Sequence, residues 1–177
     1  MKQAAIASLA MLALTVSGCA RHPDAPPAAK DTKDTKAIQG FDAIHLERTA
    51  CFGECPVYQL DIARDGSGSF TGKEFVKAKG VREVRLSPGD VALMSAVLER
   101  SGFASWKASY LSAEDGCTTM YTDNPSVTIS VTKGGKTKTV MLYQGCSGPA
   151  VPTEAVDWLA NTIDFLANIR ALTLLPR

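Results

Sequence analysis

A regular alternation of apolar and polar residues predicts the first clear strand of the chain. In residues 57–63 every second side chain is large and apolar, and this period of two is typical of a strand that buries one face. Asp65 and Gly66 follow, and they favour a hairpin turn because glycine accepts the positive φ that such turns need. Residues 68–72 are therefore predicted to form the return strand.

A second hairpin is the clearest one in the sequence. Residues 126–131 and 137–143 are two strand-like runs that flank a Lys-Gly-Gly-Lys turn at residues 133–136. Weaker strands are predicted over residues 43–46 and within residues 74–86. The sequence thus predicts a sheet that is built mainly from hairpins.

Two stretches have the spacing of an amphipathic helix. The first is predicted to begin with Ser87 as the N-cap and Pro88 in the first turn, and to end at Gly102. The second is predicted to begin at residues 152–153. Its buried face is expected to consist of Val156, Leu159, Ile163, Leu166 and Ile169, with Trp158 and Phe165 on the flank.

The order of the predicted elements is strands, helix, hairpin, helix. This order indicates an α+β fold in which an antiparallel β-sheet carries two helices packed on one face. Residues 41–177 are expected to form this single domain. Residues 103–124 are expected to be irregular, and a loop of this length in a compact domain is either held by a crosslink or functional.

The first forty residues differ in composition from the rest. Residues 1–18 combine a positive start with an apolar run too short to span a bilayer, which is typical of a secretory signal segment. Small residues directly precede Cys19, and this pattern resembles the lipobox of bacterial lipoproteins, in which the cysteine is acylated and becomes the first residue. Residues 19–40 contain several prolines and almost no apolar residues to bury, and they are predicted to form a disordered tether.

Charge and the residue after Cys19 extend this prediction. Removal of residues 1–18 takes away one lysine, so that 18 basic residues balance 18 acidic residues. No basic excess points to nucleic acid, and the N-terminal lipid must provide the attachment to the membrane. Ala20 follows the cysteine, and the resemblance to lipoproteins without an aspartate at this position implies the outer membrane, with the domain facing the periplasm.

The cysteine content agrees with export from the cytoplasm. The cysteines that remain for the domain are Cys51, Cys55, Cys117 and Cys146. An even number in an oxidising compartment indicates two disulfides, and the sequence alone does not choose among the possible pairings. The second hairpin brings the surroundings of Cys117 and Cys146 together, which makes that bridge a natural one.

Three stretches of the sequence resemble one bacterial domain family. Residues 48–58 (RTACFGECPVY), 121–128 and 143–146 are similar to the family of unknown function numbered 6438, which occurs in secreted proteins and lipoproteins. The resemblance covers about residues 41–172. It implies membership of this family and brings no activity, substrate or cofactor with it.

The cysteine loop has a structural interpretation. In this interpretation Cys51 and Cys55 form disulfides, with each other or with the two later cysteines. Gly53 serves a tight loop in which a side chain is expected to clash, and Pro56 begins the next strand without needing an amide donor. Tyr58 packs on the sheet.

Two chemical interpretations of the same loop stay open. A reactive disulfide needs a thiolate that is stabilised by a helix N-terminus or a cation. Arg48 is the candidate cation, whereas Glu54 would raise the pKa of a neighbouring thiol. The Cys-x-x-x-Cys-Pro spacing also resembles the copper site of Sco-type assembly proteins, with Cys51, Cys55 and His45 as candidate ligands.

We therefore expect a non-catalytic envelope module that needs no cofactor and binds an unknown envelope protein or ligand. Its candidate surface combines the long loop at residues 103–124 with the cysteine loop. The loop residues concerned are Cys51, Phe52, Gly53, Cys55, Pro56 and Tyr58. The alternative function is thiol–disulfide exchange or copper handling by the Cys51/Cys55 pair.

Overall fold

The computed structural model of the protein describes residues 40–174. The predicted signal segment (residues 1–18), the predicted lipidation site Cys19 and residues 20–39 of the predicted tether lie outside the described residues. Between residues 40 and 174, no helix combines the length and the apolar character needed to cross a bilayer.

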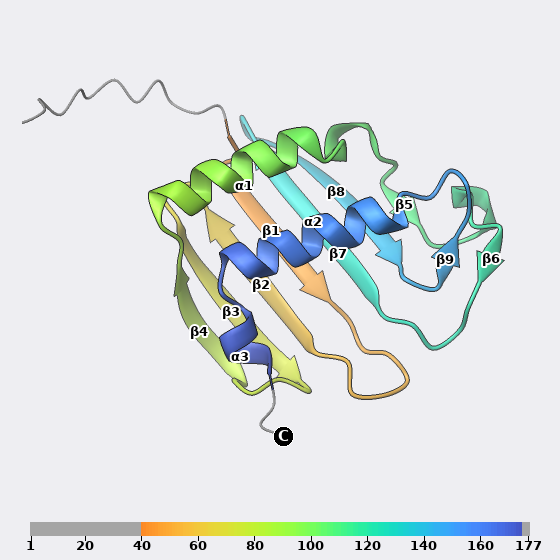
Figure 1. The fold of residues 1–177 in the computed structure, drawn as a ribbon, viewed down its shortest axis with the longest axis horizontal. Coiled ribbons are helices and arrows are strands. Elements are labelled where there is room, and N and C mark those ends of the chain that lie inside the picture. The colour runs from red at the N-terminus through yellow and green to blue at the C-terminus, as the bar shows by residue number, and fades with distance from the viewer. Residues whose placement is uncertain (1–39, 175–177) are drawn as a thin grey trace, which may run out of the picture. The chain divides into compact units, whose positions relative to one another are not determined.

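Seven strands form the main sheet, in the spatial order β4-β3-β2-β1-β7-β8-β5 (Figure 1). These strands are β1 (Ala43–Arg48), β2 (Val57–Ala63), β3 (Ser67–Glu74), β4 (Gly80–Arg85), β5 (Ser109–Tyr110), β7 (Ser126–Lys133) and β8 (Lys136–Tyr143). Neighbouring strands are antiparallel, except that β5 runs parallel to β8. Two further short strands, β6 (Thr119–Met120) and β9 (Cys146–Ser147), pair with each other.

The helices lie on one side of the main sheet. Helix α1 (Pro88–Arg100) and helix α2 (Thr153–Leu166) both cross this side, and the short helix α3 (Arg170–Thr173) follows α2 (Figure 1). Two 3-10 turns, η1 (Phe103–Ser105) and η2 (Ala113–Asp115), lie in the connection between α1 and β6. The helical layer leaves the other face of the sheet uncovered in the described part of the chain (Figure 1).

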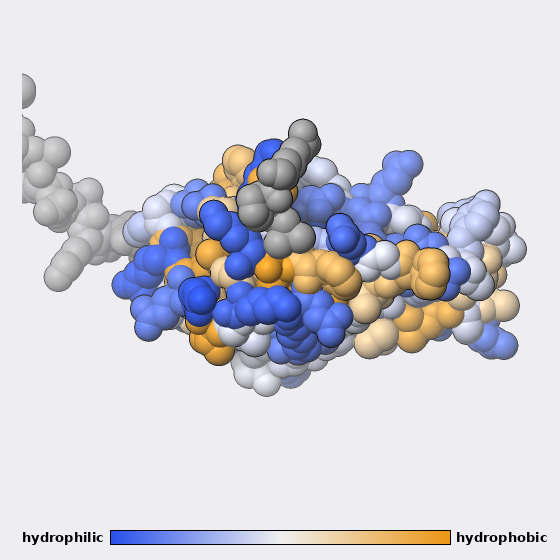
Figure 2. Space-filling view, turned by 90° about the horizontal axis from the view of Figure 1, so that it is seen from below, coloured by the Kyte–Doolittle hydropathy of each residue, from blue (hydrophilic) through white to orange (hydrophobic). Residues whose placement is uncertain are grey.

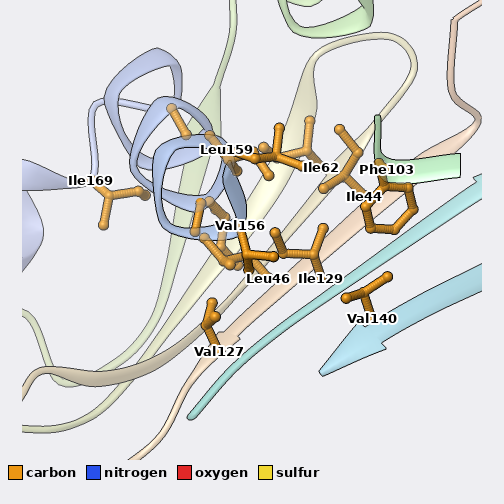
Figure 3. Packing of buried hydrophobic residues seen from close by; sticks show 14 of the residues in the cluster. Ile44, Leu46, Ile62, Phe103, Val127, Ile129, Val140, Val156, Leu159 and Ile169 are labelled. Atoms are coloured by element: carbon orange, nitrogen blue, oxygen red, sulfur yellow. The ribbon is translucent and has the colours of Figure 1, made fainter. Parts of the chain in front are cut away.

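The hydrophobic core lies between the helical layer and the sheet. The alternation predicted for residues 57–63 is present, because Tyr58, Leu60 and Ile62 are all buried. Figure 3 shows Val156 and Leu159 of α2 close to the apolar side chains of the sheet. Each such side chain contributes roughly 1.5–3 kcal/mol when it is fully buried, so the apolar faces hold the two layers together.

The beginning of α1 forms as the sequence predicts. The backbone N–H of Asp90 donates to Ser87 Oγ, and the Asp90 carboxylate accepts from the backbone N–H of Ser87, which completes a capping box. Pro88 occupies the first turn, where its missing N–H costs no hydrogen bond. The helix ends at Arg100, and Gly102 follows with a φ of +82°.

The predicted α+β class is confirmed, and two details of the prediction are wrong. The sheet is mixed because β5 is parallel to β8. Residues 103–124 are not irregular throughout, because they contain η1, β5, η2 and β6. Strands of two residues are too short to produce an alternating pattern, and their pairing partners are distant in the sequence, so the chain carries no local signal for them.

Candidate interaction surface

Two loops meet at the end of the sheet where β1 ends and β7 begins (lower edge of Figure 1). The backbone N–H of Phe52 donates to the carbonyl of Asp123 at 3.0 Å. The backbone N–H of Ser126 donates to Thr49 Oγ1 at 2.7 Å, and the N–H of Thr49 donates to the carbonyl of Ser126 at 3.0 Å. The structure therefore places the cysteine loop against the end of the long loop.

The first of these loops is closed by a disulfide between Cys51 and Cys55, whose Cα atoms lie 5.7 Å apart. Both cysteines are half-buried, whereas Phe52 has 88% of its surface exposed. Gly53 has a φ of +150°, but a Cβ at this position would meet nothing closer than Cys51 Sγ at 3.8 Å. The expected steric clash at Gly53 is therefore wrong, and the backbone conformation is the reason that glycine is favoured here.

The second loop is fixed through the backbone of Tyr121. Its N–H donates to the carbonyl of Gly145 at 2.8 Å, and its carbonyl accepts from the hydroxyl of Tyr143 at 2.7 Å. The side-chain amide of Asn124 donates to the same carbonyl at 3.2 Å. Three hydrogen bonds thus hold the backbone of Tyr121, while its side chain is exposed to solvent.

The close packing around Tyr121 makes Gly145 a sensitive position. Replacing Gly145 with alanine is expected to lower the free energy of unfolding by about 2–3 kcal/mol, because the new Cβ would overlap the carbonyl oxygen of Tyr121 and the ring of Tyr143. Gly89→Ala in α1 is a matched control, since its nearest neighbour is Ser87 Oγ at 3.7 Å and alanine suits a helix. Urea unfolding measures both variants. A Gly145→Ala protein as stable as the control would contradict this packing.

The two loops together expose an apolar and acidic area, which we call the loop-end surface. It consists of Phe52, Glu54, Met120, Tyr121 and Asp123, all of them exposed. Figure 2 views the molecule from this edge of the sheet and shows hydrophobic residues at the surface between hydrophilic ones. Hydrogen bonds and a disulfide hold the backbone of both loops in place. The large side chains at this edge are therefore preorganised for binding.

A polar network behind the loop-end surface joins β1 and β2 to α2. Arg48 donates to Asp164 Oδ2 from Nε at 3.0 Å and from Nη2 at 2.8 Å, and its Nη2 also donates to Asn161 Oδ1 at 2.9 Å. The hydroxyl of Tyr58 donates to the same Asp164 oxygen at 2.7 Å. Asp164 Oδ1 is buried and has no hydrogen-bond partner among residues 40–174. The network fastens the end of β1, where the cysteine loop begins, to the helical layer.

Burial and mutual charge set the protonation states in this network. Burial acts to lower the pKa of Arg48, but the adjacent Asp164 carboxylate outweighs it and the pKa is raised. Burial raises the pKa of the Asp164 carboxyl, against the opposing effect of Arg48. Burial and the neighbouring Asp164 also raise the pKa of the Tyr58 hydroxyl. Tyr58 therefore stays a neutral donor and Arg48 stays a cation at physiological pH.

The sequence contains signals for this network, although the alternation of apolar and polar residues does not reveal it. Arg48 has the same strand parity as Ile44 and Leu46, which are buried, and Tyr58 lies on the apolar side of β2. A guanidinium and a phenol at buried strand positions need polar partners. Asp164 accepts these hydrogen bonds, and it lies in a helix more than one hundred residues later in the chain. No sequence pattern identifies it as the partner.

The second disulfide joins Cys117 to Cys146, and the two bridges expected from the cysteine count are thus present. The Cα atoms of this pair lie 5.2 Å apart, and both residues are buried. The bridge lies beside the β6–β9 pair, where Met120 is the register partner of Cys146. It fastens the long loop to β9, which follows β8 in the chain.

The structure places the remaining candidate residues away from the loop-end surface. Tyr58 is buried in the core, as part of the polar network. His45 lies on the helix-free face of the sheet, where its Nδ1 is 2.7 Å from Asp61 Oδ1, and both residues line a hollow of about 890 Å³. Over residues 40–174, no group of three or more His, Cys, Asp or Glu side chains could hold a metal ion. Within these residues, His45 therefore does not join Cys51 and Cys55 in a three-residue metal-binding group.

Helix α2 adds exposed aromatic side chains that the sequence analysis placed on its flank. Trp158 and Phe165 lie seven residues apart, so they share one face of the helix, and both are exposed. Asn161, which lies between them in the sequence, contacts Arg48. The aromatic face of α2 therefore adjoins the element from which the cysteine loop begins.

The fold and this surface define the class of protein: an α+β domain with a mixed sheet, a one-sided helical layer and two disulfide-bridged loops. The sequence model of the family described as "Domain of unknown function (DUF6438)" matches residues 42–167. The chain belongs to this family, and the family membership predicted from the sequence is confirmed. No curated protein matches the chain.

Proposed function

We propose that the protein is a lipid-anchored, non-catalytic interaction module of the bacterial envelope, and that it binds a partner protein through the loop-end surface. The anchor is the acylated Cys19, at the outer membrane facing the periplasm. Residues 19–40 form the tether, and residues 41–177 form the binding domain. The lipobox-like sequence before Cys19 supports the anchor, and the two disulfides support an oxidising compartment.

One observation carries the binding role. Phe52 is 88% exposed at the tip of a loop that is closed by a disulfide and hydrogen-bonded to the neighbouring loop. Tyr121, 64% exposed, projects from that neighbouring loop. Aromatic residues are enriched among those that dominate binding energy at interfaces, and a fixed backbone lowers the entropy lost on binding.

The position of this surface suits an anchored module. The described residues begin at Gly40, next to the start of β1, and the cysteine loop begins after the other end of that strand. Six strand residues separate these two ends by roughly 20 Å. The chain therefore enters the domain at the end of β1 that is opposite to the loop-end surface, so this attachment point does not occupy that surface.

The proposal predicts that binding depends on the exposed aromatic residues. The full-length protein with Phe52→Ala and Tyr121→Ala is expected to capture its envelope partner at least about tenfold less well than the wild type after reversible cross-linking and affinity purification. The matched control is Val81→Ala and Leu93→Ala, which removes exposed apolar side chains from β4 and α1. Capture that is unaffected by the first pair, or reduced equally by the control pair, would refute the proposal.

A second candidate function rests on the accessibility of one bridge. Cys51 and Cys55 are half-buried, whereas Cys117 and Cys146 are buried, so thiol–disulfide exchange or copper handling would use the first pair. Arg48, the candidate cation for stabilising a thiolate, is engaged by Asp164, which weakens this alternative. Alkylation of thiols across redox buffers, followed by peptide mapping, distinguishes the functions. Selective reduction of Cys51–Cys55 at mild potentials would favour the redox function.

A further inference from the structure

We propose that the loop-end surface recognises a cationic partner, namely a protein segment that carries lysine or arginine side chains. This inference rests on the proposed binding role of that surface and specifies the chemistry of the partner.

The elements at the loop-end surface, and the helix that adjoins them, carry charges of one sign. These elements are residues 49–56, residues 119–126 and α2 (Thr153–Leu166), and none of them contains a lysine or arginine. Their charged residues are all carboxylates: Glu54, Asp123, Glu154, Asp157 and Asp164. In a chain with nearly equal numbers of acidic and basic residues, such a one-sided distribution creates a local negative potential.

Within residues 40–174, an ion pair with lysine or arginine neutralises one of these carboxylates, Asp164. Arg48 reaches into this region, and it is paired with Asp164. Asp157 accepts a hydrogen bond from the neutral side chain of Gln144 at 2.7 Å. Within residues 40–174, Glu54, Asp123 and Glu154 form no ion pair with a lysine or arginine. Their negative charge is therefore available to a partner.

Hydrogen bonds connect the segments that carry Glu54, Asp123 and Asp157. The N–H of Phe52 contacts the carbonyl of Asp123, which places the Glu54 loop beside Asp123. Gln144 joins the same loop to α2, because its backbone N–H donates to the carbonyl of Pro125 at 2.9 Å while its side chain donates to Asp157. The negative potential thus extends from the cysteine loop to the first turns of α2.

The aromatic side chains on this surface favour the same kind of partner. The exposed faces of Phe52 and Tyr121, and of Trp158 on the adjoining helix α2, attract a lysine or arginine head group through the ring quadrupole. The apolar stems of lysine and arginine also pack on exposed rings while the charged head stays near a carboxylate. An acidic peptide or an anionic lipid surface would instead be repelled, so the combination of rings and carboxylates selects for cations.

The test uses the full-length protein in detergent and two fluorescent probe peptides of equal length, one alternating lysine and leucine and one alternating glutamate and leucine. Fluorescence anisotropy at low salt is expected to show binding of the lysine probe at least about tenfold tighter than that of the glutamate probe. Raising the ionic strength to about 1 M is expected to remove most of the difference, because the Debye length falls to about 3 Å. Equal affinities, or no binding of the lysine probe, would overturn the proposal.

Matched charge variants show where the probe binds. Glu54→Gln with Asp123→Asn is expected to weaken binding of the lysine probe about tenfold, whereas Glu83→Gln with Glu99→Gln, which removes the same charge elsewhere, is expected to change it less than about twofold. Equal loss in both pairs would mean nonspecific attraction and would overturn the inference. Capture of the natural partner that depends on Phe52 and Tyr121 but not on Glu54 and Asp123 would exclude a cationic partner. The same result would still support binding through the loop-end surface.

Discussion

Replacing Arg48 with methionine is expected to lower the free energy of unfolding by about 3–5 kcal/mol, the cost of removing one partner from a buried ion pair. The side chains of Arg48 and Asp164 are 17% and 19% exposed, so water cannot replace the lost cation effectively. Asp164 would keep the Tyr58 hydroxyl as a donor, and its Oδ1 already lacks a partner among the described residues. Urea unfolding at neutral pH measures the effect.

Two further variants show whether the effect comes from the buried pair. Arg64→Met removes a guanidinium that is 70% exposed and paired with Asp42, and it is expected to cost less than about 1 kcal/mol. Adding Asp164→Leu to Arg48→Met removes the uncompensated carboxylate and is expected to restore much of the lost stability. If Arg48→Met were no more harmful than Arg64→Met, the network would not be an important contact between α2 and the sheet.

The stability of the Arg48→Met variant should have a characteristic pH dependence. Burial already raises the pKa of Asp164 in the folded protein, and the loss of Arg48 removes the main opposing charge and raises it further. A folded protein that binds a proton more tightly than the unfolded chain gains stability as the pH falls through the raised pKa. The destabilisation caused by Arg48→Met is therefore expected to be smaller at pH 4 than at pH 7. A larger loss at pH 4 would contradict this account.

The second large effect concerns the two disulfides. Replacing Cys117 and Cys146 with alanine is expected to lower the free energy of unfolding by about 3–4 kcal/mol in the chain-entropy model, because the bridge closes a loop between residues 29 positions apart. Replacing Cys51 and Cys55 is expected to cost about 2 kcal/mol, because these residues are 4 positions apart. The two double variants serve as controls for each other in the same urea unfolding experiment. A larger loss of free energy of unfolding from the Cys51/Cys55 variant would contradict the structural role of the buried bridge.

The parts of the fold that the sequence predicts are those set by residues close together in the chain. Turns at Gly66 and at residues 133–136, and the capping box at Ser87, are fixed by residues that are close together in the chain. The parallel pairing of β5 with β8 depends on contacts between two residues and a distant strand, so no local pattern predicts it. The class of fold followed from the order of the elements, whereas the exact membership of the sheet did not.

The candidate site likewise has one part that the sequence predicts and another part that it does not. Its cysteine loop was visible in the sequence because two cysteines, a glycine and a proline occur within six residues. The other contacts of the site join segments that are far apart in the chain. They are the hydrogen bond between the cysteine loop and Asp123, the packing of Tyr121 against Gly145, and the Arg48–Asp164 ion pair. The sequence thus located one loop of the surface, and only the fold shows which other residues complete it.

The most direct test of the proposed function is to locate the contact with the partner in the living cell. A photo-reactive phenylalanine analogue at position 52 of the full-length protein, in its native cell, is compared with the same analogue at Val81, which is 64% exposed on β4. A defined cross-linked adduct is expected from position 52, and it should be absent or much weaker from position 81. An adduct from position 81 but not from position 52, or no adduct from position 52, would contradict the proposal that the loop-end surface binds a protein.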